Sequence, residues 1–159
     1  MPKYTTKDIR NLVLAGGAFS GKTTLVEHLL HHVGLIPRPG RIEDGNTVCD
    51  YDALEKEYKH SLDSALVHFD YHGSHINLID TPGSADFLGK TISCFPAVET
   101  IAVVISAATG VDTVTRRLMK TARERNLPRI IIVNKIDHGD DLAEVLMGIQ
   151  ETFGSECLP

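Results

Sequence analysis

One short segment, from Gly16 to Thr23, constrains the fold of this chain more than any other feature. It reads GGAFSGKT and fits the pattern G-x-x-x-x-G-K-[ST], whose glycines let the backbone curl around phosphate groups. An apolar, β-branched run precedes it, and an amphipathic helical pattern begins at Lys22. Backbone N–H groups and the dipole of that helix attract anions at such a junction. The segment therefore predicts a phosphate-binding loop between a buried strand and a helix.

The residues of this loop have distinct expected roles. Lys22 is expected to contact the outer phosphates and to assist catalysis, and Thr23 to offer its hydroxyl to Mg²⁺. The other nucleotide-binding residues expected in the loop are Gly16, Gly17, Ala18, Phe19, Ser20, Gly21 and Thr24. Taken by itself, the pattern is also compatible with an ordinary strand-turn-helix junction that binds no ligand.

Apolar runs and helical patterns alternate along the chain. Three apolar runs are typical of strands buried on both faces of a parallel sheet: residues 9–15, 101–106 and 129–134. A three-to-four spacing of apolar residues predicts helices over 22–33, 112–126 and 140–153. Two shorter strands, expected over 64–71 and 74–80, meet at His72-Gly73 and predict a hairpin.

This alternation predicts an α/β fold of the P-loop NTPase type. The expected architecture is a three-layer α/β/α sandwich with a mostly parallel sheet and one antiparallel edge hairpin. Residues 34–62 are polar and show no sustained period, so we expect a long loop there. A loop of that length in a compact domain is usually functional or mobile.

A second motif, Asp80-Thr81-Pro82-Gly83, ends the second strand of the expected hairpin. An aspartate at this place can hold the shell of Mg²⁺, usually through water, and the Gly83 N–H can bond a γ-phosphate. By itself the pattern D-x-x-G is more often only a turn. Its position makes it informative, because open α/β sheets bind their ligands at the carboxyl ends of strands.

A third motif, Asn134-Lys135-Ile136-Asp137, closes the last apolar run. Asp137 can accept from the ring N–H and the exocyclic amine of guanine, a donor pair that adenine lacks, and losing a buried hydrogen bond costs ~1–3 kcal/mol. Asn134 would brace the base and the loop, and the Lys135 stem would cover the ring. The three motifs in this order favour guanine-nucleotide binding over an ATP-using P-loop enzyme.

Nearly the whole chain, from Asn11 to Leu158, resembles the GTPase domain of elongation factor G and its relatives. The resemblance is carried by GKTTLVEHLL, SALVHFDYHGSHINLIDTPGSADF, AVVISAATGV, AATGVDTVTRRLMKTARERNLP and NKID. It implies a GTP-binding switch that uses Mg²⁺, hydrolyses GTP to GDP and phosphate, and acts at the ribosome in the cytoplasm. It also implies that Ser61, in the first mobile loop, gives Mg²⁺ a hydroxyl beside Thr23 and Asp80.

Three departures from the family pattern bear on activity. Ser84 stands where the family usually has a histidine that places the attacking water, so Ser84 is a weak catalytic candidate beside Lys22 and Gly83. Hydrolysis is then expected to be slow, differently assisted or absent. Lys59 replaces a glycine, which is expected to alter the backbone of the first mobile loop, and Phe19 replaces an aspartate. The alternative function is therefore a guanine-nucleotide-binding module with little or no hydrolysis.

The family pattern continues beyond Pro159, the last residue of this chain. A last strand and an S-A-[KL] loop over the guanine are missing, so we expect residues 1–159 to be an incomplete G domain from a larger multidomain translation factor. Residues 129–134 would then form an apolar sheet edge, which invites pairing with another chain. We expect self-association or poor solubility.

The composition narrows the class of partners. A formal charge of −5 argues against direct nucleic-acid binding by this domain. No apolar run approaches the ~20 residues that a membrane span needs. Cys49, Cys94 and Cys157 have the spacing of neither a disulfide framework nor a zinc site. His60 lies beside Ser61, so a role in sensing the nucleotide is the alternative to an ordinary loop position.

Overall fold

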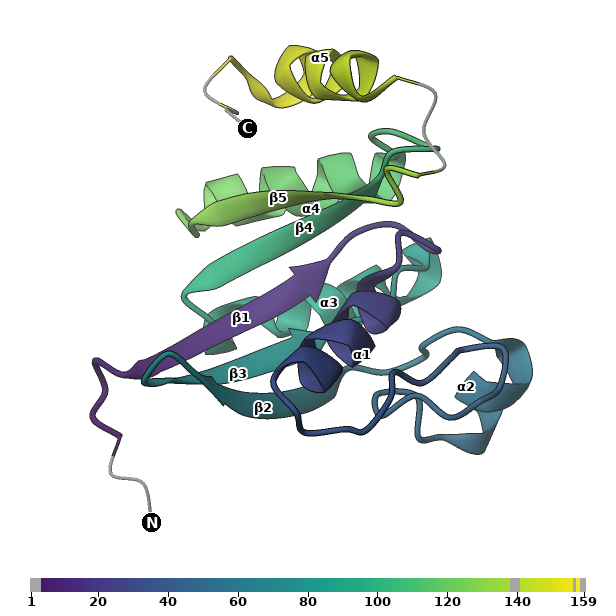
Figure 1. The fold of residues 1–159 in the computed structure, drawn as a ribbon. Helices are drawn as coiled ribbons and strands as arrows, with labels where there is room; N and C mark the ends of the chain where they lie inside the picture. The colour runs from purple at the N-terminus through teal and green to yellow at the C-terminus, as the bar shows by residue number, and fades with distance from the viewer. Residues whose placement is uncertain (1–3, 138–140, 156, 158–159) are drawn as a thin grey trace.

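The computed structural model describes residues 4–137, 141–155 and 157, and its framework is a five-stranded sheet (Figure 1). The strands are β1 (Ile9–Ala15), β2 (Ala65–Tyr71), β3 (Ser74–Asp80), β4 (Thr100–Ser106) and β5 (Arg129–Asn134). Their order in the sheet is β2-β3-β1-β4-β5. β2 and β3 pair antiparallel, and the other neighbours pair parallel.

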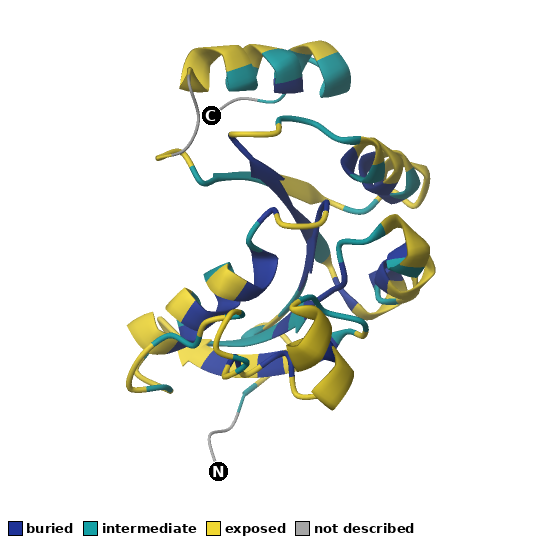
Figure 2. Ribbon diagram, turned by 90° about the vertical axis from the view of Figure 1, so that its right-hand side faces the viewer, coloured by how far each residue is buried: buried dark blue, intermediate teal, exposed yellow. Residues whose placement is uncertain are grey.

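Helices cover both faces of this sheet. They are α1 (Lys22–His32), α2 (Ala53–Tyr58), α3 (Leu88–Ser93), α4 (Thr113–Glu124) and α5 (Leu142–Phe153), with short 3-10 turns at Ala85–Phe87 and Phe95–Ala97. On one face, Leu30 of α1 shares a core with Val104. On the other face, Leu118 of α4 and Ile149 of α5 share a core with Val103. Figure 2 shows the buried residues gathered along the sheet and the helix faces turned toward it.

The predicted fold class is confirmed. The sheet is mostly parallel, its one antiparallel pair is the hairpin at the edge, and helices lie in a layer on either side. β1, β3 and β5 have the predicted bounds, while β2 and β4 each differ by one residue. Asp140, where the last helix was expected to begin, lies outside the described residues. None of the helices in the described ranges is long and apolar enough to cross a bilayer.

The prediction of a loop throughout residues 34–62 is wrong, because α2 forms within it. Asp52 begins this helix as a capping box: its side chain accepts from the Leu54 N–H at 2.8 Å, and its own N–H donates to Glu55 at 3.1 Å. This reciprocal cap satisfies N–H groups that a short helix otherwise leaves unpaired. A helix of six residues is too short for apolar periodicity to reveal.

The prediction that residues 129–134 are buried on both faces is also wrong. Arg129 and Ile130 are exposed, and the rest of β5 is only partly buried. In the part of the sheet that the structure describes, β5 is an edge strand whose one neighbour is β4. An edge strand has no second neighbour to remove its side chains from water.

Glu27 of α1 fixes the segment that follows the helix. Its carboxylate is fully buried and accepts from the N–H groups of Gly40 at 2.8 Å and Val48 at 2.5 Å. Burying a charge is costly unless hydrogen bonds compensate it, and these two donors do so. The segment is thereby held against α1, and Cys49 joins the core on that face of the sheet.

Candidate nucleotide-binding site

The three sequence motifs lie at the carboxyl ends of β1, β3 and β5. These strands run parallel to one another within the sheet, so their carboxyl ends open at the same edge (Figure 1). Open α/β sheets bind ligands at the carboxyl ends of their strands, where loops from separated strands meet. The fold therefore brings the residues of the three motifs together in one region.

The phosphate loop closes around the side chain of Lys22. This residue is 6% exposed, and its Nζ donates to the carbonyl oxygens of Gly16 at 3.1 Å and Gly17 at 2.9 Å. Burial lowers the pKa of Lys22, and the negative charges of Asp80 and Asp112 oppose that shift. A buried cation at the amino-terminal end of a helix is well suited to bind an anion.

Close backbone contacts explain the glycines of the site. A Cβ on Gly16 would lie 2.3 Å from the carbonyl oxygen of Val104. A Cβ on Gly83 would lie 2.5 Å from Lys22 Nζ and 2.6 Å from the carbonyl oxygen of Gly17. The glycine of the second motif therefore packs directly on the phosphate loop, beside the same ammonium group.

Side-chain oxygens from three segments meet beside this loop. Thr23 Oγ1 donates to Asp80 Oδ2 at 2.6 Å and lies 3.3 Å from Ser61 Oγ. Burial raises the pKa of Asp80 to about 6, against the opposing effects of the Thr23 hydrogen bond and the Lys22 charge. Its other oxygen, Oδ1, is buried without a hydrogen-bond partner among the described residues. An orphaned carboxylate oxygen beside two hydroxyls fits a hard cation such as Mg²⁺.

Asp50 joins these oxygens without any signal in the sequence. Its buried carboxylate accepts from Ser61 Oγ at 2.7 Å and from Thr47 Oγ1 at 2.9 Å. The adjacent Cys49 is buried too, and burial is the main cause that raises the pKa of its thiol. Because Asp50 belongs to an aperiodic segment and to no motif, only the folded contacts identify it.

The third motif is fastened to the phosphate loop. Asn134 Nδ2 donates to the Ser20 carbonyl oxygen at 2.9 Å, across 114 positions of sequence. The same amide nitrogen would lie 2.4 Å from a Cβ on Gly21, so these segments are in close contact. Lys135 follows with a left-handed φ of 56°, and Asp137 is exposed. The first and third motifs thus form one continuous surface.

The remaining expected site residues lie around this surface. Ala18, Phe19 and Thr24 are exposed, and Phe19 has a left-handed φ of 59°. Ser84 caps the short turn after the second motif, because its Oγ accepts from the Asp86 N–H at 3.4 Å. Its hydroxyl therefore already has a structural contact.

Lys59, the residue expected to alter the first mobile loop, follows α2 directly. It has a φ of 56° and a ψ of 35°, the left-handed conformation that glycine adopts most easily. The neighbouring His60 places Nδ1 2.9 Å from the carbonyl oxygen of Tyr58. The chain thus takes a glycine-like bend at a lysine, shortly before Ser61.

Asp112 is a second residue that the motifs do not reveal. It caps α4, because its Oδ1 accepts from the Thr115 N–H at 2.6 Å. Its Oδ2 lies only 1.7 Å from the place where a Cβ on Gly17 would stand. A side chain at position 17 would therefore clash with the carboxylate of Asp112, which packs against the phosphate loop at Gly17.

Known proteins resemble this chain over nearly all of its length. The model of the elongation factor Tu GTP binding domain matches residues 7–157. An elongation factor G-like protein of Mycobacterium tuberculosis is 38% identical over 152 residues, which are 95% of this chain and 21% of that protein. Mitochondrial ribosome-releasing factor 2 of Drosophila willistoni is 37% identical over 135 residues, 85% of this chain and 18% of that protein.

A solved structure shares the fold as well. A crystal structure of a protein from Thermus thermophilus superposes with a TM-score of 0.88 at 36% identity, over 92% of this chain and 22% of that one. This chain spans about a fifth of the length of the curated relatives it matches.

The contact between Gly17 and Asp112 predicts a paired effect on stability. We expect Gly17→Ala to lower the free energy of unfolding by about 1 kcal/mol, because the new methyl group displaces Asp112 from its capping position. In a chain that carries Asp112→Ser, whose shorter side chain still offers a capping oxygen, the same substitution should cost much less. Urea denaturation of the four variants measures this coupling, and equal costs in both backgrounds would contradict the contact.

Proposed function

The chain belongs to the family of the elongation factor Tu GTP binding domain, and we propose that it binds GTP and GDP between the phosphate loop and the loop of Asn134 to Asp137. It is a GTP-binding domain of the elongation factor G-like type. The observation that carries the proposal is the hydrogen bond from Asn134 to Ser20, at 2.9 Å. This bond holds the expected base-binding loop against the expected phosphate-binding loop, so one bound nucleotide would contact both loops.

The phosphates would bind where Lys22 now contacts loop carbonyls. Its ammonium and the backbone N–H groups of Gly16 to Gly21 would neutralise and bond the phosphate oxygens, and Thr24 would flank them. Gly83 lies beside Lys22, so its N–H is suited to the terminal phosphate of GTP. The phosphate loop would serve GDP and GTP alike, whereas Gly83 would contact GTP alone.

Thr23, Ser61 and Asp80 would hold Mg²⁺, with Asp50 behind Ser61. When bound, the ion supplies positive charge that offsets the negative charge of the outer phosphates. Thr23 and Ser61 present hydroxyls 3.3 Å apart, and Asp80 presents its orphaned Oδ1 through water or directly. Asp50 accepts from Ser61 and so fixes the direction in which the Ser61 oxygen points.

Guanine selection is assigned to Asp137. Replacing it with asparagine should weaken GDP binding about tenfold or more, because an amide cannot accept from both guanine donors. Xanthosine diphosphate should gain affinity, since its 2-oxo group can accept from the new amide. Titration with fluorescent GDP and xanthosine diphosphate measures the exchange of preference. Asp86→Asn, a matched change on an exposed turn, should leave both affinities unaltered, and unchanged GDP binding by Asp137→Asn would refute the assignment.

Hydrolysis of GTP is the proposed reaction, with Lys22 and Gly83 acting on the terminal phosphate and Ser84 as the weak element. A serine cannot place water as an imidazole can. Ser84→His should therefore raise single-turnover GTP hydrolysis about tenfold or more over Ser84→Ala, the control that loses the same capping oxygen. A histidine variant no faster than the alanine variant would show that position 84 does not limit the reaction.

The alternative is a guanine-nucleotide-binding module with little hydrolysis, favoured by the capping role of Ser84. Ribosomes are the proposed partner of the full-length protein, because the Drosophila willistoni relative is named a ribosome-releasing factor. Single-turnover hydrolysis by the full-length protein, with and without ribosomes, separates the two functions. Stimulation by ribosomes that is lost in Lys22→Ala supports a GTPase, and its absence supports the binding module.

The exposed edge of β5 is proposed to drive self-association. A groove of about 950 Å³ runs along it between α4 and α5. Its lining combines apolar side chains, which include Ile130, Ile136 and Leu146, with four basic side chains. Ile130 is 50% exposed, and unpaired backbone groups on an edge strand invite a further strand.

Ile130→Lys should accordingly raise the monomer fraction at high concentration, because a charge on an edge strand opposes pairing. Leu54→Lys is the matched control, since Leu54 is 51% exposed on α2, outside the sheet. Light scattering coupled to gel filtration measures the mass of each variant. A wild-type chain that stays monomeric at high concentration would contradict the proposal.

A further inference from the structure

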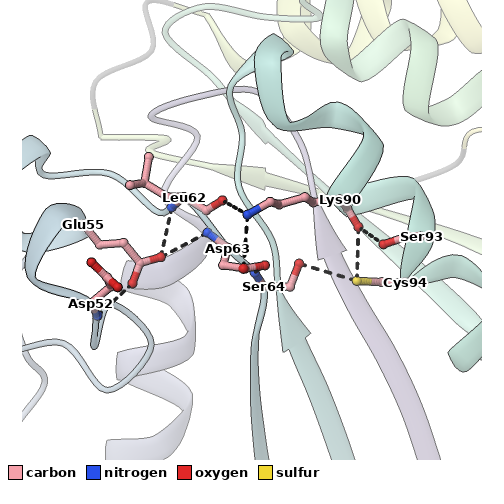
Figure 3. Close-up of polar contacts among 8 residues, drawn as sticks. All are labelled: Asp52, Glu55, Leu62, Asp63, Ser64, Lys90, Ser93 and Cys94. Atoms are coloured by element: carbon pink, nitrogen blue, oxygen red, sulfur yellow. Dashed lines mark hydrogen bonds and ion pairs between the residues drawn. The ribbon is translucent and has the colours of Figure 1, made fainter.

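Lys90 of α3 binds the backbone that directly follows Ser61. Its Nζ donates to the Leu62 carbonyl oxygen at 3.0 Å and forms an ion pair with Asp63 Oδ2 at 3.1 Å (Figure 3). The side chain also lies over the ring of Phe87, with Nζ 5.6 Å from the ring centroid. One lysine thus connects the helix after the second motif to the segment that carries a proposed magnesium ligand.

The next residue of the same helix binds the second motif itself. Thr91 is 1% exposed, and its Oγ1 donates to the Pro82 carbonyl oxygen at 3.0 Å. Pro82 directly precedes Gly83, and Leu62, which Lys90 binds, directly follows Ser61. Two adjacent residues of α3 therefore bind the backbone beside Gly83 and the backbone beside Ser61.

Glu55 of α2 holds the same segment from the other side. This residue is 2% exposed, and its Oε1 accepts from the N–H groups of Leu62 at 2.9 Å and Asp63 at 3.1 Å. In Figure 3 the segment lies between Glu55 and Lys90. With the amide side fixed by α2, a change at Lys90 acts on the hydrogen bond to Leu62 and the ion pair to Asp63 that join this segment to α3.

The end of α3 reinforces this arrangement. Cys94 Sγ donates to the Lys90 carbonyl oxygen at 3.4 Å and to Ser64 Oγ at 3.5 Å, and Ser93 Oγ donates to the same Lys90 carbonyl oxygen at 2.7 Å (Figure 3). The backbone of Lys90 is therefore held in place, and its side chain extends from there to Leu62 and Asp63. Because hydrogen bonds of sulfur are weak, the contacts of Lys90 are the stronger connection between α3 and this segment.

We propose that Lys90 is a positioning residue that couples the Ser61 segment to the Gly83 loop, so that both respond together to the terminal phosphate of GTP. The coupling rests on the proposed nucleotide site. Neither Lys90 nor Asp63 is among the residues proposed to contact the nucleotide or Mg²⁺. They hold Ser61 and Gly83 in fixed relative positions through α3. The coupling changes the affinity for GTP and not for GDP, because GDP has no terminal phosphate at that position.

The expected size of the effect follows from exposure. The side chains of Lys90 and Asp63 are 45% and 63% exposed, so the ion pair is screened by solvent and weakened by salt. The hydrogen bond to the Leu62 carbonyl oxygen adds to it. A two- to fivefold change in GTP affinity is the magnitude that such a link supports.

The test uses Lys90→Met, which keeps the apolar stem and removes the charge, with Lys120→Met as the matched control on the exposed face of α4. Two readouts are measured on the purified chain: amide hydrogen exchange at Leu62 and Asp63 without nucleotide, and affinities for GTPγS and GDP with Mg²⁺. In Lys90→Met, exchange should accelerate two- to fivefold and GTPγS affinity should fall two- to fivefold while GDP affinity stays constant. Lys90→Arg should restore most of the slow exchange and most of the GTPγS affinity, and Lys120→Met should change neither quantity.

Three results would overturn the coupling: unchanged exchange at Leu62 and Asp63, equal loss of GTPγS and GDP affinity, or faster exchange without any change in GTPγS affinity. A wild-type chain that binds neither nucleotide would refute the proposed function instead. Exchange at Leu62 and Asp63 then decides alone whether Lys90 positions the Ser61 segment, because the contacts of Lys90 are present without a ligand. Acceleration confined to Lys90→Met would support it, and its absence would overturn it.

Discussion

The buried ammonium of Lys22 is the interaction on which the rest of the site depends. A cation removed from water needs acceptors close by, and the carbonyl oxygens of Gly16 and Gly17 supply them. Those acceptors are available only if the loop curls tightly, and the close approach of Gly83 follows from the same curl. The charge of Lys22 also opposes the rise in the pKa of Asp80. The proposed phosphate side and the proposed magnesium side of the site are thus electrostatically linked.

Buried carboxylates, more than apolar side chains, organise the long segment between α1 and β2. Glu27 and Glu55 each accept from two or more backbone N–H groups, and Asp50 accepts from the hydroxyls of Thr47 and Ser61. Each such bond contributes only about 1 kcal/mol, or somewhat more with a charged acceptor. A segment held by a few contacts of this size can rearrange without disturbing the sheet, which is the property that a nucleotide-responsive loop needs.

Most of the fold could be predicted because its signals are local. The apolar run before Gly16 and the glycine pattern of the loop both lie within a few residues, and three of the five strands have the predicted bounds. Asp50, Lys90 and Asp112 could not be predicted. Asp50 belongs to an aperiodic segment and to no motif, while Lys90 and Asp112 lie against Leu62 and Gly17, which are far away in the sequence. The carboxylate of Asp112 matters to Gly17 only because the start of α4 packs on the phosphate loop. Contacts of this kind produce neither a hydrophobic period nor a motif in the amino-acid sequence.

The proposed switch depends on α3 more than on the phosphate loop. The loop of Asn134 and the backbone of the phosphate loop would bind the parts that GDP and GTP share, so they cannot tell the two apart. A ligand shifts a conformational equilibrium only by its difference in affinity for the two states. Beside Lys22, that difference is proposed to arise at Ser61 and Gly83, which come from separate segments of the chain. The contacts that α3 makes beside both, through Lys90 and Thr91, allow a phosphate bound at one to stabilise the other.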